Sequence, residues 1–551
     1  MILETTRFRL IAGLLMTLAA IPAAAQSVQP ASGLSTAEVE QYERFAQTLL
    51  QWPGEAWTIR GFSAKQEARL GIFPALHPWS ARVSSTGAAG SGVVSLLPLE
   101  GEIILNSAFP FGDNDGSVWA GKGLTTVIRG GFSARWNRVA LKIAPTIFRA
   151  ANSSFVLMNN NLPGKLQFAD GQFPDVVDRP QRFGETAYQV IDPGQSSLSL
   201  EGAGVVGGIS TANQSWGPSE RYQFILGNNA AGFAHVFVGS QEPLNVGFAR
   251  IHARFMWGML EQSAFSPVGG PQHFESGVHS GRRRFTSGVV STVLPNAVPG
   301  MEIGFARFLH SAWPEDGLSA GDFTALFQNV FKKNLPKEAP LPGTDNTQGV
   351  RDNQLFSLFT RWAPPGTGFE VYGEFGRDDH SFDMRDLLQE PDHGGASRLL
   401  GVRKMWNTGY ALRAETINYE APQLTKFRPE GSVYLHYVLR QGHTQRGQPL
   451  GANTGLGSGS GAFVAVDRYS AGGRTTFEWS RAVAHRSGTY YLGGAELRNV
   501  PDVMHTLSGE AVRFRDRMDV TGKLGLTLNF NRNFQSDVFN LHLVVGTRYR
   551  F

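Results

Sequence analysis

Four short segments carry residue types that occur in catalytic or metal sites. Residues 317–321 (GLSAG) match the G-x-S-x-G pattern of a nucleophilic serine. That chemistry needs a buried strand before the serine, whereas residues 312–316 read AWPED, which is not a strand pattern. A helical pattern does follow over 322–333, so we expect Ser319 to start a helix rather than to attack a substrate.

The other three segments also favour structural roles. Residues 113–116 (DNDG) begin like a calcium loop, but the glutamate required at the twelfth position is missing, and we expect a turn. Residues 378–380 (DDH) lack a partner histidine at ligand spacing, which favours a solvated acidic loop. Residues 455–461 (GLGSGSG) lack the Lys-Ser/Thr of a phosphate loop, which favours a flexible loop. The sequence therefore predicts no catalytic residue, no metal site and no cofactor.

Planar polar side chains and isolated aromatics are concentrated in residues 172–243. Such a mixture suits sugars, which accept hydrogen bonds from Arg, Asn and Gln and stack on aromatic faces. The alternative is a set of turns with side chains that fill a barrel lumen, and the residues leave both interpretations open. The candidate polysaccharide-binding residues are Arg182, Trp216, Asn228, Asn229 and His235.

Two segments of this block, 179–184 (RPQRFG) and 216–218 (WGP), resemble the Wzi-type capsule assembly family of bacterial outer-membrane proteins. The resemblance covers most of the chain from about residue 67 onward. It implies a closed barrel with a periplasmic helical part, an occluded lumen and a role as a non-enzymatic surface lectin. Family members often carry a paired Trp before Gly-Pro, where this chain has Ser215, which implies weaker or different sugar binding. Further matching segments are 106–110 (NSAFP), 114–116 (NDG), Trp119 and 121–123 (GKG).

The elements that position these residues are predicted to be strands. Residues 540–551 (NLHLVVGTRYRF) alternate between an apolar and a polar face, with Val544 as the exception. The polar face of such segments often carries charge, which suits a wet or plugged lumen better than a packed core. The same alternation occurs in residues 138–143, 251–258, 369–375, 410–415, 435–440 and 523–530.

These patterns predict an all-β fold, a large antiparallel transmembrane β-barrel of about 16–18 strands with short turns at one end and long loops at the other. We expect the lumen to be plugged, because helical patterns at 322–333 and 382–390 lie in long loops that would close the barrel mouth. The expected long loops are 311–352, 378–396, 441–460 and 486–505.

The N-terminal region has the pattern of an exported protein. Residues 1–25 resemble a signal peptide, with Arg7 and Arg9 before an apolar stretch and small residues before Gln26. Residues 26–66 are expected to form a periplasmic leader, and residues 67–551 the outer-membrane barrel. An amphipathic helix is predicted over 35–51, either solvated or docked against the barrel.

Composition excludes several kinds of site and argues against a nucleic-acid partner. The chain has no cysteine, which excludes Cys-based zinc sites, iron–sulfur clusters and cysteine nucleophiles. Its net charge is +4 and 17% of its residues are charged, so we expect no nucleic-acid partner. The predicted function is to bind or anchor capsular or other surface polysaccharide in the outer membrane, with lipid as the second partner and a monomer favoured. The alternative is a porin-like channel for small anionic or sugar solutes.

Overall fold

The computed structural model describes eleven stretches of the chain, and all statements below refer to them. The predicted signal peptide and the polar leader before residue 36 lie outside these stretches. The described residues are 36–49, 56–60, 77–79, 93–266, 283–314, 316–335, 352–391, 395–420, 433–436, 439–484 and 501–551.

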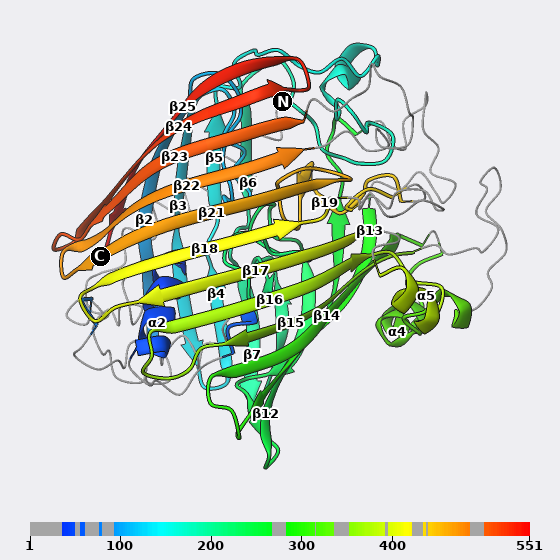
Figure 1. Ribbon diagram of the computed structural model, residues 1–551, viewed down its shortest axis with the longest axis vertical. Coiled ribbons are helices and arrows are strands. Elements are labelled where there is room, and N and C mark those ends of the chain that lie inside the picture. Colours follow the sequence, from blue (N-terminus) through cyan, green and yellow to red (C-terminus); the bar gives the residue numbers. More distant parts are fainter. Residues whose placement is uncertain are drawn as a thin grey trace.

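The chain forms a closed antiparallel barrel, as predicted (Figure 1). β4 and β5 continue one wall strand across a short break, and so do β6 and β7, which gives a wall of 18 strands. β2 pairs with β25, so the first and last wall strands close the barrel. The wall strands are β2 (Val93–Asn106), β3 (Gly123–Trp136), β4 (Val139–Ile143), β5 (Thr146–Ala150), β6 (Tyr188–Asp192), β7 (Ser197–Gly202), β8 (Val205–Ser210), β10 (His235–Ser240), β12 (Ala249–Glu261), β13 (Arg283–Pro295), β14 (Met301–Ala312), β15 (Asp352–Trp362), β16 (Phe369–Asp378), β17 (Ala396–Met405), β18 (Tyr410–Asn418), β21 (Gly459–Ser470), β22 (Gly473–Ala484), β23 (Asp502–Arg513), β24 (Met518–Arg532) and β25 (Ser536–Tyr549).

The remaining elements are short. They are α2 (Thr36–Leu49), β1 (Ile59–Arg60), η1 (Gly164–Phe168), β9 (Ser215–Trp216), β11 (Leu244–Asn245), α4 (Ala320–Thr324), η2 (Ala325–Phe327), η3 (Lys332–Asn334), α5 (Met384–Gln389), β19 (Thr444–Gln445) and β20 (Gln448–Pro449). Within the described residues, none of the helices is long and apolar enough to cross a membrane.

The apolar and polar faces predicted for residues 540–551 are the outer and inner faces of β25 in the barrel wall. Leu543, Val545 and Tyr549 are exposed on the outer face of the barrel, while His542 and Val544 are buried on the inner face. Apolar side chains on the outside and polar ones inside are the pattern of strands in contact with lipid. Val544, the one apolar exception on the inner face, packs in a small core with residues of β2 and β3.

The two ends of the barrel differ as expected. Two residues join β3 to β4, β7 to β8 and β21 to β22, at the end where β2 begins and β25 stops. Long connections occupy the other end, including 151–187, 211–234 and 419–458. Short turns lie on the periplasmic side of such barrels and long loops on the extracellular side.

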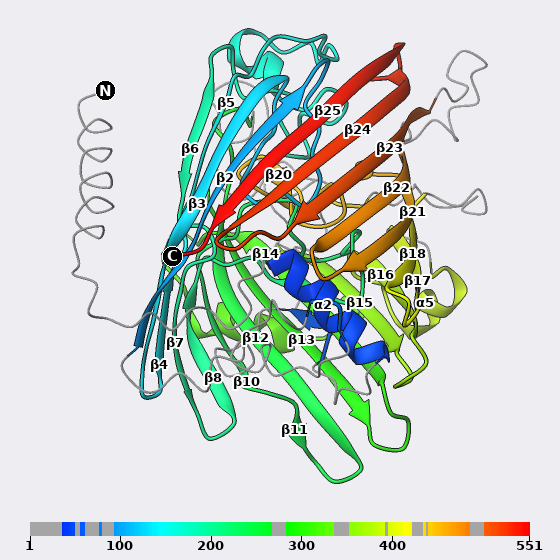
Figure 2. The same ribbon diagram turned by 90° about the vertical axis from the view of Figure 1, so that its left-hand side faces the viewer.

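The helix α2 is docked against the barrel rather than solvated. It lies across the short-turn end (Figure 2). Tyr42 and Phe45 are buried in a cluster with Trp79, Met405 and Tyr469. The apolar face of the helix therefore covers the short-turn end of the barrel.

Two predictions about the loops were wrong. Residues 435–440 were expected to be a strand, but no strand includes any of the described residues of this segment, and Leu435 and Leu439 are buried inside the barrel. This false strand explains why an up-and-down count from the sequence slips between 411 and 440. The helical pieces of 320–334 and 384–389 do form, but they lie at the outside of the wall instead of closing the mouth (Figure 1).

Candidate functional site

The lumen is filled by two long connections, which we call the plug: residues 211–234 and the described residues of 433–458. Their apolar side chains pack against inward-facing side chains of the wall and form one large buried cluster with them. Plug members of this cluster include Trp216, Tyr222, Phe224, Ile225, Leu226, Phe233, Tyr434 and Leu450, and wall members include Met256, Phe308, Leu355, Phe359 and Phe463.

Glycines of the wall make room for the aromatic side chains of the plug. A Cβ atom on Gly288 would lie 2.7 Å from the indole of Trp216, and one on Gly376 would lie 2.3 Å from the ring of Phe224. Both glycines face inward in the middle of strands, where a glycine often marks a close approach of another group. The plug therefore sits in recesses that the wall sequence provides.

One carboxylate of β18 holds four consecutive residues of the plug. Glu415 accepts hydrogen bonds from the backbone amides of residues 220–222 at 2.6–3.0 Å and from the hydroxyl of Ser219 at 2.9 Å. The hydroxyl of Tyr372 also donates to it at 2.7 Å. A buried carboxylate needs such donors to offset its lost hydration, and here the plug supplies most of them.

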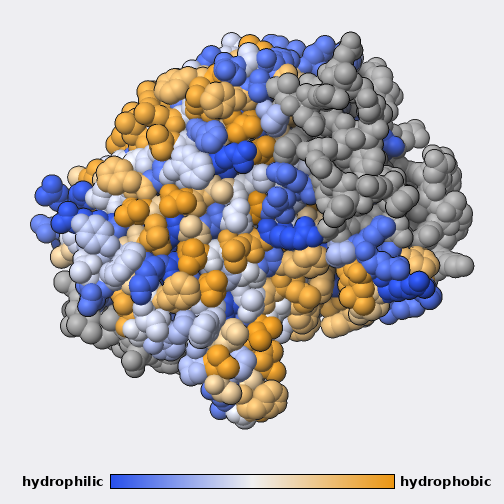
Figure 3. Space-filling view, in the orientation of Figure 1, coloured by the Kyte–Doolittle hydropathy of each residue, from blue (hydrophilic) through white to orange (hydrophobic). Residues whose placement is uncertain are grey.

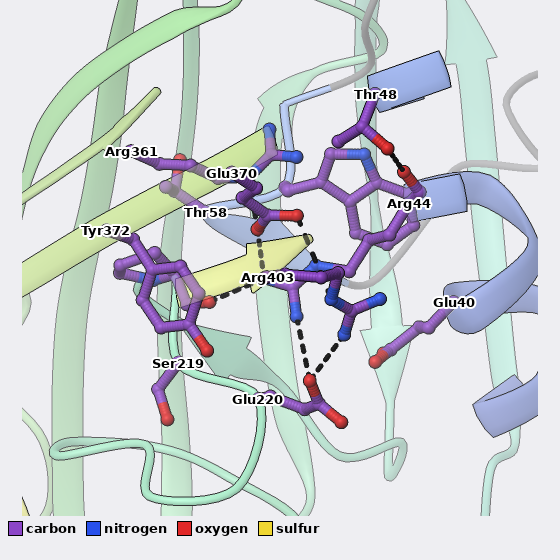
Figure 4. A network of polar contacts seen from close by, with 12 residues as sticks. Glu40, Arg44, Thr48, Thr58, Ser219, Glu220, Arg361, Glu370, Tyr372 and Arg403 are labelled. Atoms are coloured by element: carbon purple, nitrogen blue, oxygen red, sulfur yellow. Dashed lines mark hydrogen bonds and ion pairs between the residues drawn. The ribbon is translucent and has the colours of Figure 1, made fainter. Parts of the chain in front are cut away.

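A buried ion network joins α2, the plug and the wall (Figure 4). Arg44 of α2 contacts Glu370 of β16 at 3.1 Å and Glu220 of the plug at 3.8 Å. Arg361 of β15 contacts the same oxygen of Glu370 at 2.9 Å and also binds Gln47 of α2 at 2.6 Å. The helix is thus fixed by charge pairing as well as by its apolar face.

The charge of Glu220 is balanced by arginines from three elements. Arg403 of β17 and Arg413 of β18 both donate hydrogen bonds to its carboxylate, beside Arg44 of α2. Burial would raise the pKa of Glu220, but these guanidinium groups outweigh burial and lower its pKa well below the usual range. The plug therefore carries a permanent negative charge where it meets α2 and the wall.

The N-terminal segment after α2 pairs directly with the plug. Residues 59–60 form a short antiparallel ladder with residues 215–216. Glu302 of β14 accepts the amides of Trp57 and Thr58 at 3.2 and 3.1 Å and thereby fixes the same segment to the wall. Gly217 continues this path with a positive φ of 90°, which favours glycine, and a Cβ there would lie 2.7 Å from Glu374.

Three of the predicted polysaccharide-binding residues lie in the plug itself. Trp216 is 0% exposed and packs edge-to-face on Phe308. Asn229 is buried, donates to the carbonyl of Gly451 at 2.9 Å and accepts the amide of Asn114 at 2.9 Å. Asn228 is partly exposed and donates to the carbonyl of Asn114 at 2.6 Å. These side chains hold the plug to its neighbours, and a role in sugar binding stays a prediction.

The other two predicted residues lie beside the plug. Arg182 is buried, donates to the carbonyl oxygen of Asn152 at 2.6 Å and lies over the ring of Phe168. His235 opens β10, is buried, and its Nδ1 lies 2.8 Å from the carbonyl oxygen of Phe233. The structure thus brings three of the five residues together in the plug, and in this conformation Asn228 alone among the five has appreciable exposed surface.

An arginine three residues before Arg182 is better exposed. Arg179 lies in the long connection 151–187, its side chain is 37% exposed, and its Nε contacts Asp170 at 3.2 Å. The planar guanidinium of arginine binds carboxylate groups in a bidentate way. The sequence contains both arginines in one short segment, and it held no signal for which of them is buried.

The motifs with chemical residue types have structural roles. Ser319 caps α4 as predicted, with its hydroxyl 2.7 Å from Asp322. Residues 113–116 form the predicted turn, with positive φ at Asn114 and Gly116, and Asp113 contacts Arg221 of the plug at 2.6 Å.

The two remaining motifs differ from prediction. Asp378 and His380 are buried rather than solvated, because the amide of Tyr434 in the plug donates to Asp378 at 2.5 Å. Residues 455–461 are mostly buried, and the last three start β21. Both expectations of open loops failed because Asp378 borders the plug and residues 455–458 belong to it. Among the described residues, no group of three or more His, Asp or Glu is placed to hold a metal ion.

The fold resembles that of a solved outer-membrane protein. No family model matches the sequence, and no curated protein matches it. Wzi, an outer-membrane protein involved in group 1 capsule assembly in Escherichia coli and described as a carbohydrate-binding β-barrel, aligns with a TM-score of 0.57 over 94% of this chain and 97% of its own, at 11% identity. The two proteins share a fold.

Two structures from Pseudomonas aeruginosa align less well. OccK9 (OpdG) has a TM-score of 0.41 and 8% identity over 83% of this chain and 98% of its own. OccK5 (OpdH) has a TM-score of 0.40 and 8% identity over 85% of this chain and 100% of its own. The alignment with Wzi shows that the chain described here has the fold of an outer-membrane β-barrel, with the finer function to be inferred from its site.

Proposed function

We propose that this protein binds or anchors capsular or other surface polysaccharide at the cell surface, without catalysis. The observation that carries the proposal is the filled lumen. An empty barrel of this size leaves an aqueous channel, whereas here plug and wall bury one another and α2 covers the periplasmic end. A barrel built in this way is suited to present its long extracellular loops to a polymer rather than to pass solutes.

The loops offer chemistry that fits a sugar polymer. Arg179 presents a half-exposed guanidinium, and Asn228 presents a half-exposed amide. Trp216, Asn229 and His235 act in this proposal through the plug, which carries Asn228. Arg182 acts through the connection 151–187, which carries Arg179, because it bonds Asn152 and Glu185. The similarity in fold to Wzi, whose description names carbohydrate binding, supports the same proposal.

The first experiment compares cell-bound with released surface polysaccharide in a strain that lacks the protein. We expect the polymer to be made but shed into the medium, and restored retention when the wild-type gene is returned. Unchanged retention would contradict the proposed function.

Variants of the loop arginine then connect the function to the site. We expect Arg179→Ala to lower retention and to weaken binding of purified polymer by about tenfold, the scale of one charge-assisted hydrogen bond. Arg513→Ala is the matched control, because Arg513 is also exposed but lies at the short-turn end. Equal binding by both variants would remove Arg179 from the site.

Variants of Trp216 distinguish direct contact with the sugar from an indirect role through the plug. Trp216→Phe keeps an aromatic ring in the recess at Gly288, whereas Trp216→Ala empties it. If Trp216 acts through the plug, the phenylalanine variant binds polymer nearly as well as the wild type. A loss of binding in both variants, with the barrel still folded, would instead favour direct stacking on sugar.

A further inference from the structure

The outer face of β14 contains a charge where the strand pattern calls for an apolar residue. Ile303, Phe305 and Leu309 point outward, and Arg307 lies between them on the same face. An arginine facing lipid is unfavourable. Arg307 is only 4% exposed, so another part of the chain covers it.

The cover is the connection between β14 and β15, which folds back along the outer wall. Arg307 donates to the carbonyl oxygens of Leu326 at 3.0 Å, Gln328 at 2.5 Å and Asn329 at 3.3 Å, and to the side chain of Gln354 at 2.6 Å. Leu326 packs in a small core with outward-facing wall residues, namely Val289, Leu309, Phe255 and Trp257. The indole Nε1 of Trp257 donates to the carbonyl of Phe323 at 2.9 Å.

A second connection joins the first on the outer wall. Arg377 of β16 also faces outward, is buried, and donates to the carbonyl of Pro391. The two connections pair with each other through a bridge between Phe331 and Ser381 and a hydrogen bond from the amide of Lys333 to Phe382 at 2.9 Å. We call residues 319–334 and 381–391 together the outer flap; α4 and α5 mark it in Figure 1.

The exposed surface of the outer flap carries several large apolar side chains, together with exposed polar ones such as Arg385 and Gln389. Phe327 is 67% exposed and Leu388 is 75% exposed, and Phe323, Phe382 and Met384 are exposed as well. The neighbouring outer wall is also apolar, with Leu358 on β15 and Leu400 on β17 both exposed. The hydrophobic colouring of the wall reaches the region of the outer flap, where hydrophobic and hydrophilic surfaces lie side by side (Figure 3).

We propose that the outer flap is a lipid-binding surface that lies in the outer leaflet of the membrane, at the boundary between acyl chains and headgroups. Continuity with the lipid-facing wall identifies the occupant as lipid. Charges at the edge of the flap, such as the Lys333–Asp383 pair at 3.6 Å, belong at the headgroup level. Arg307 and Arg377 hold the flap from beneath through its backbone carbonyls, so it replaces part of the wall as the surface in contact with acyl chains.

Because the sequence has no cysteine, single cysteines can be introduced and labelled at chosen positions, which tests the lipid contact of the outer flap directly. Single variants Phe327→Cys and Leu388→Cys are labelled with an environment-sensitive fluorophore, and the full chain is placed in lipid nanodiscs that contain nitroxide on the acyl chains. Leu524→Cys, on the exposed outer face of β24, is the lipid-facing control, and Ser154→Cys, exposed in the connection 151–187, is the aqueous control.

We expect labels at 327 and 388 to be quenched by acyl-chain nitroxide nearly as strongly as the label at 524, and to be shielded from aqueous iodide. Lipid quenching at 327 below half of that at 524 overturns the proposal, whether iodide reaches the label or not. A label shielded from both quenchers, with cross-links between copies of Phe327→Cys, would assign the outer flap to self-association instead. None of these outcomes depends on polysaccharide binding.

Arg307→Met tests how the flap is held. We expect the label at 388 to lose at least half of its lipid quenching in this background, while the label at 524 keeps its quenching and thereby reports a folded barrel. Unchanged quenching at 388 would show that Arg307 does not hold the flap.

Discussion

At the scale of single residues, the lumen is organised by side chains whose partners come from distant parts of the chain. Glu415 accepts hydrogen bonds from Ser219 and Tyr222, which lie 196 and 193 positions earlier in the chain. Gly288 and Gly376 act by having no side chain at all, because the plug aromatics occupy the space. Neither role follows from a local pattern, since both depend on which segment fills the barrel.

The recess at Gly376 gives the first prediction. Gly376→Ala should destabilise the protein by about 1–3 kcal/mol, the usual cost of overpacking, because the new methyl group collides with Phe224. Gly373→Ala is the control, since Gly373 lies on the same strand, faces outward and has room for a Cβ. Urea unfolding in lipid measures both, and an equal effect of the two changes would contradict the recess.

The second prediction concerns pH at the long-loop end. Burial, and then the neighbouring Glu102, raise the pKa of Asp115 to about 7. A raised carboxyl pKa contributes stability below the unfolded value near ~4, and this contribution is lost as pH rises through about 7. The turn at 113–116 should therefore open more readily at pH 8 than at pH 5.

Asp115→Asn should remove this dependence. At pH 8 the amide of Gly116, which donates to Asn228 at 2.7 Å, should exchange about tenfold more slowly in the variant than in the wild type, or ~1.4 kcal/mol. At pH 5 the two proteins should exchange alike once intrinsic rates are corrected. A constant ratio at both pH values would be inconsistent with the raised pKa.

At the scale of elements, the sequence predicts the strands of the wall but not the segments that fill the lumen. Strict alternation is a local property, so β12, β16, β18, β24 and β25 appear where the sequence indicates them. Residues 435–440 alternate equally well, yet Leu435 and Leu439 are buried in the plug instead of facing lipid. Alternation indicates only that one set of side chains is buried. A segment of the plug can show this pattern without forming a strand.

The outer flap did have a signal in the sequence. Alternation places Arg307 on the same face as Ile303 and Phe305, and a lipid-facing arginine needs a cover. The helical patterns were recognised, but nothing local distinguishes a helix that folds into the mouth from one that folds against the outside. Likewise, the five candidate polysaccharide-binding residues were chosen by type, and burial separates Asn228 from the other four.

The third prediction concerns how α2 is seated. Arg548 of β25 contacts Glu38 of the first turn of α2 at 2.7 Å, and Glu100 of β2 at 2.8 Å. Arg548→Met should speed amide exchange in α2 by about tenfold, as expected when a charge-assisted bond is lost. Arg550→Met is the matched control, because Arg550 donates to carbonyl oxygens of the turn at residues 515–516. Equal protection of α2 in both variants would contradict this seating.

At the scale of the whole molecule, the lumen is closed in two layers. The plug fills the interior and is held by Glu415, while α2 covers the short-turn end and is held by Arg44. Breaking a buried charge pair by removing one partner costs about 3–5 kcal/mol. Arg44 also contacts Glu220 and the carbonyl oxygen of Pro218 in the plug, so the two layers share this residue. With only one layer loosened, we expect the other still to obstruct the lumen.

The fourth prediction follows for planar bilayers. The wild type should show little steady conductance, and Glu415→Gln or Arg44→Met alone only brief openings. The double variant should show long-lived open levels. Glu102→Gln is the control, because Glu102 pairs with Arg129 across two wall strands and contacts neither layer through that pair. A steady open level in the wild type would favour the porin-like alternative over the polysaccharide proposal.

The contact between Glu38 and Arg548 has a consequence for assembly of the barrel. The two residues are 510 positions apart, so a helix near the start of the described residues is bound by a strand near their end. The complete seat for α2 exists only after β25 has paired with β2. We therefore expect docking of α2 to be complete only after the barrel has closed.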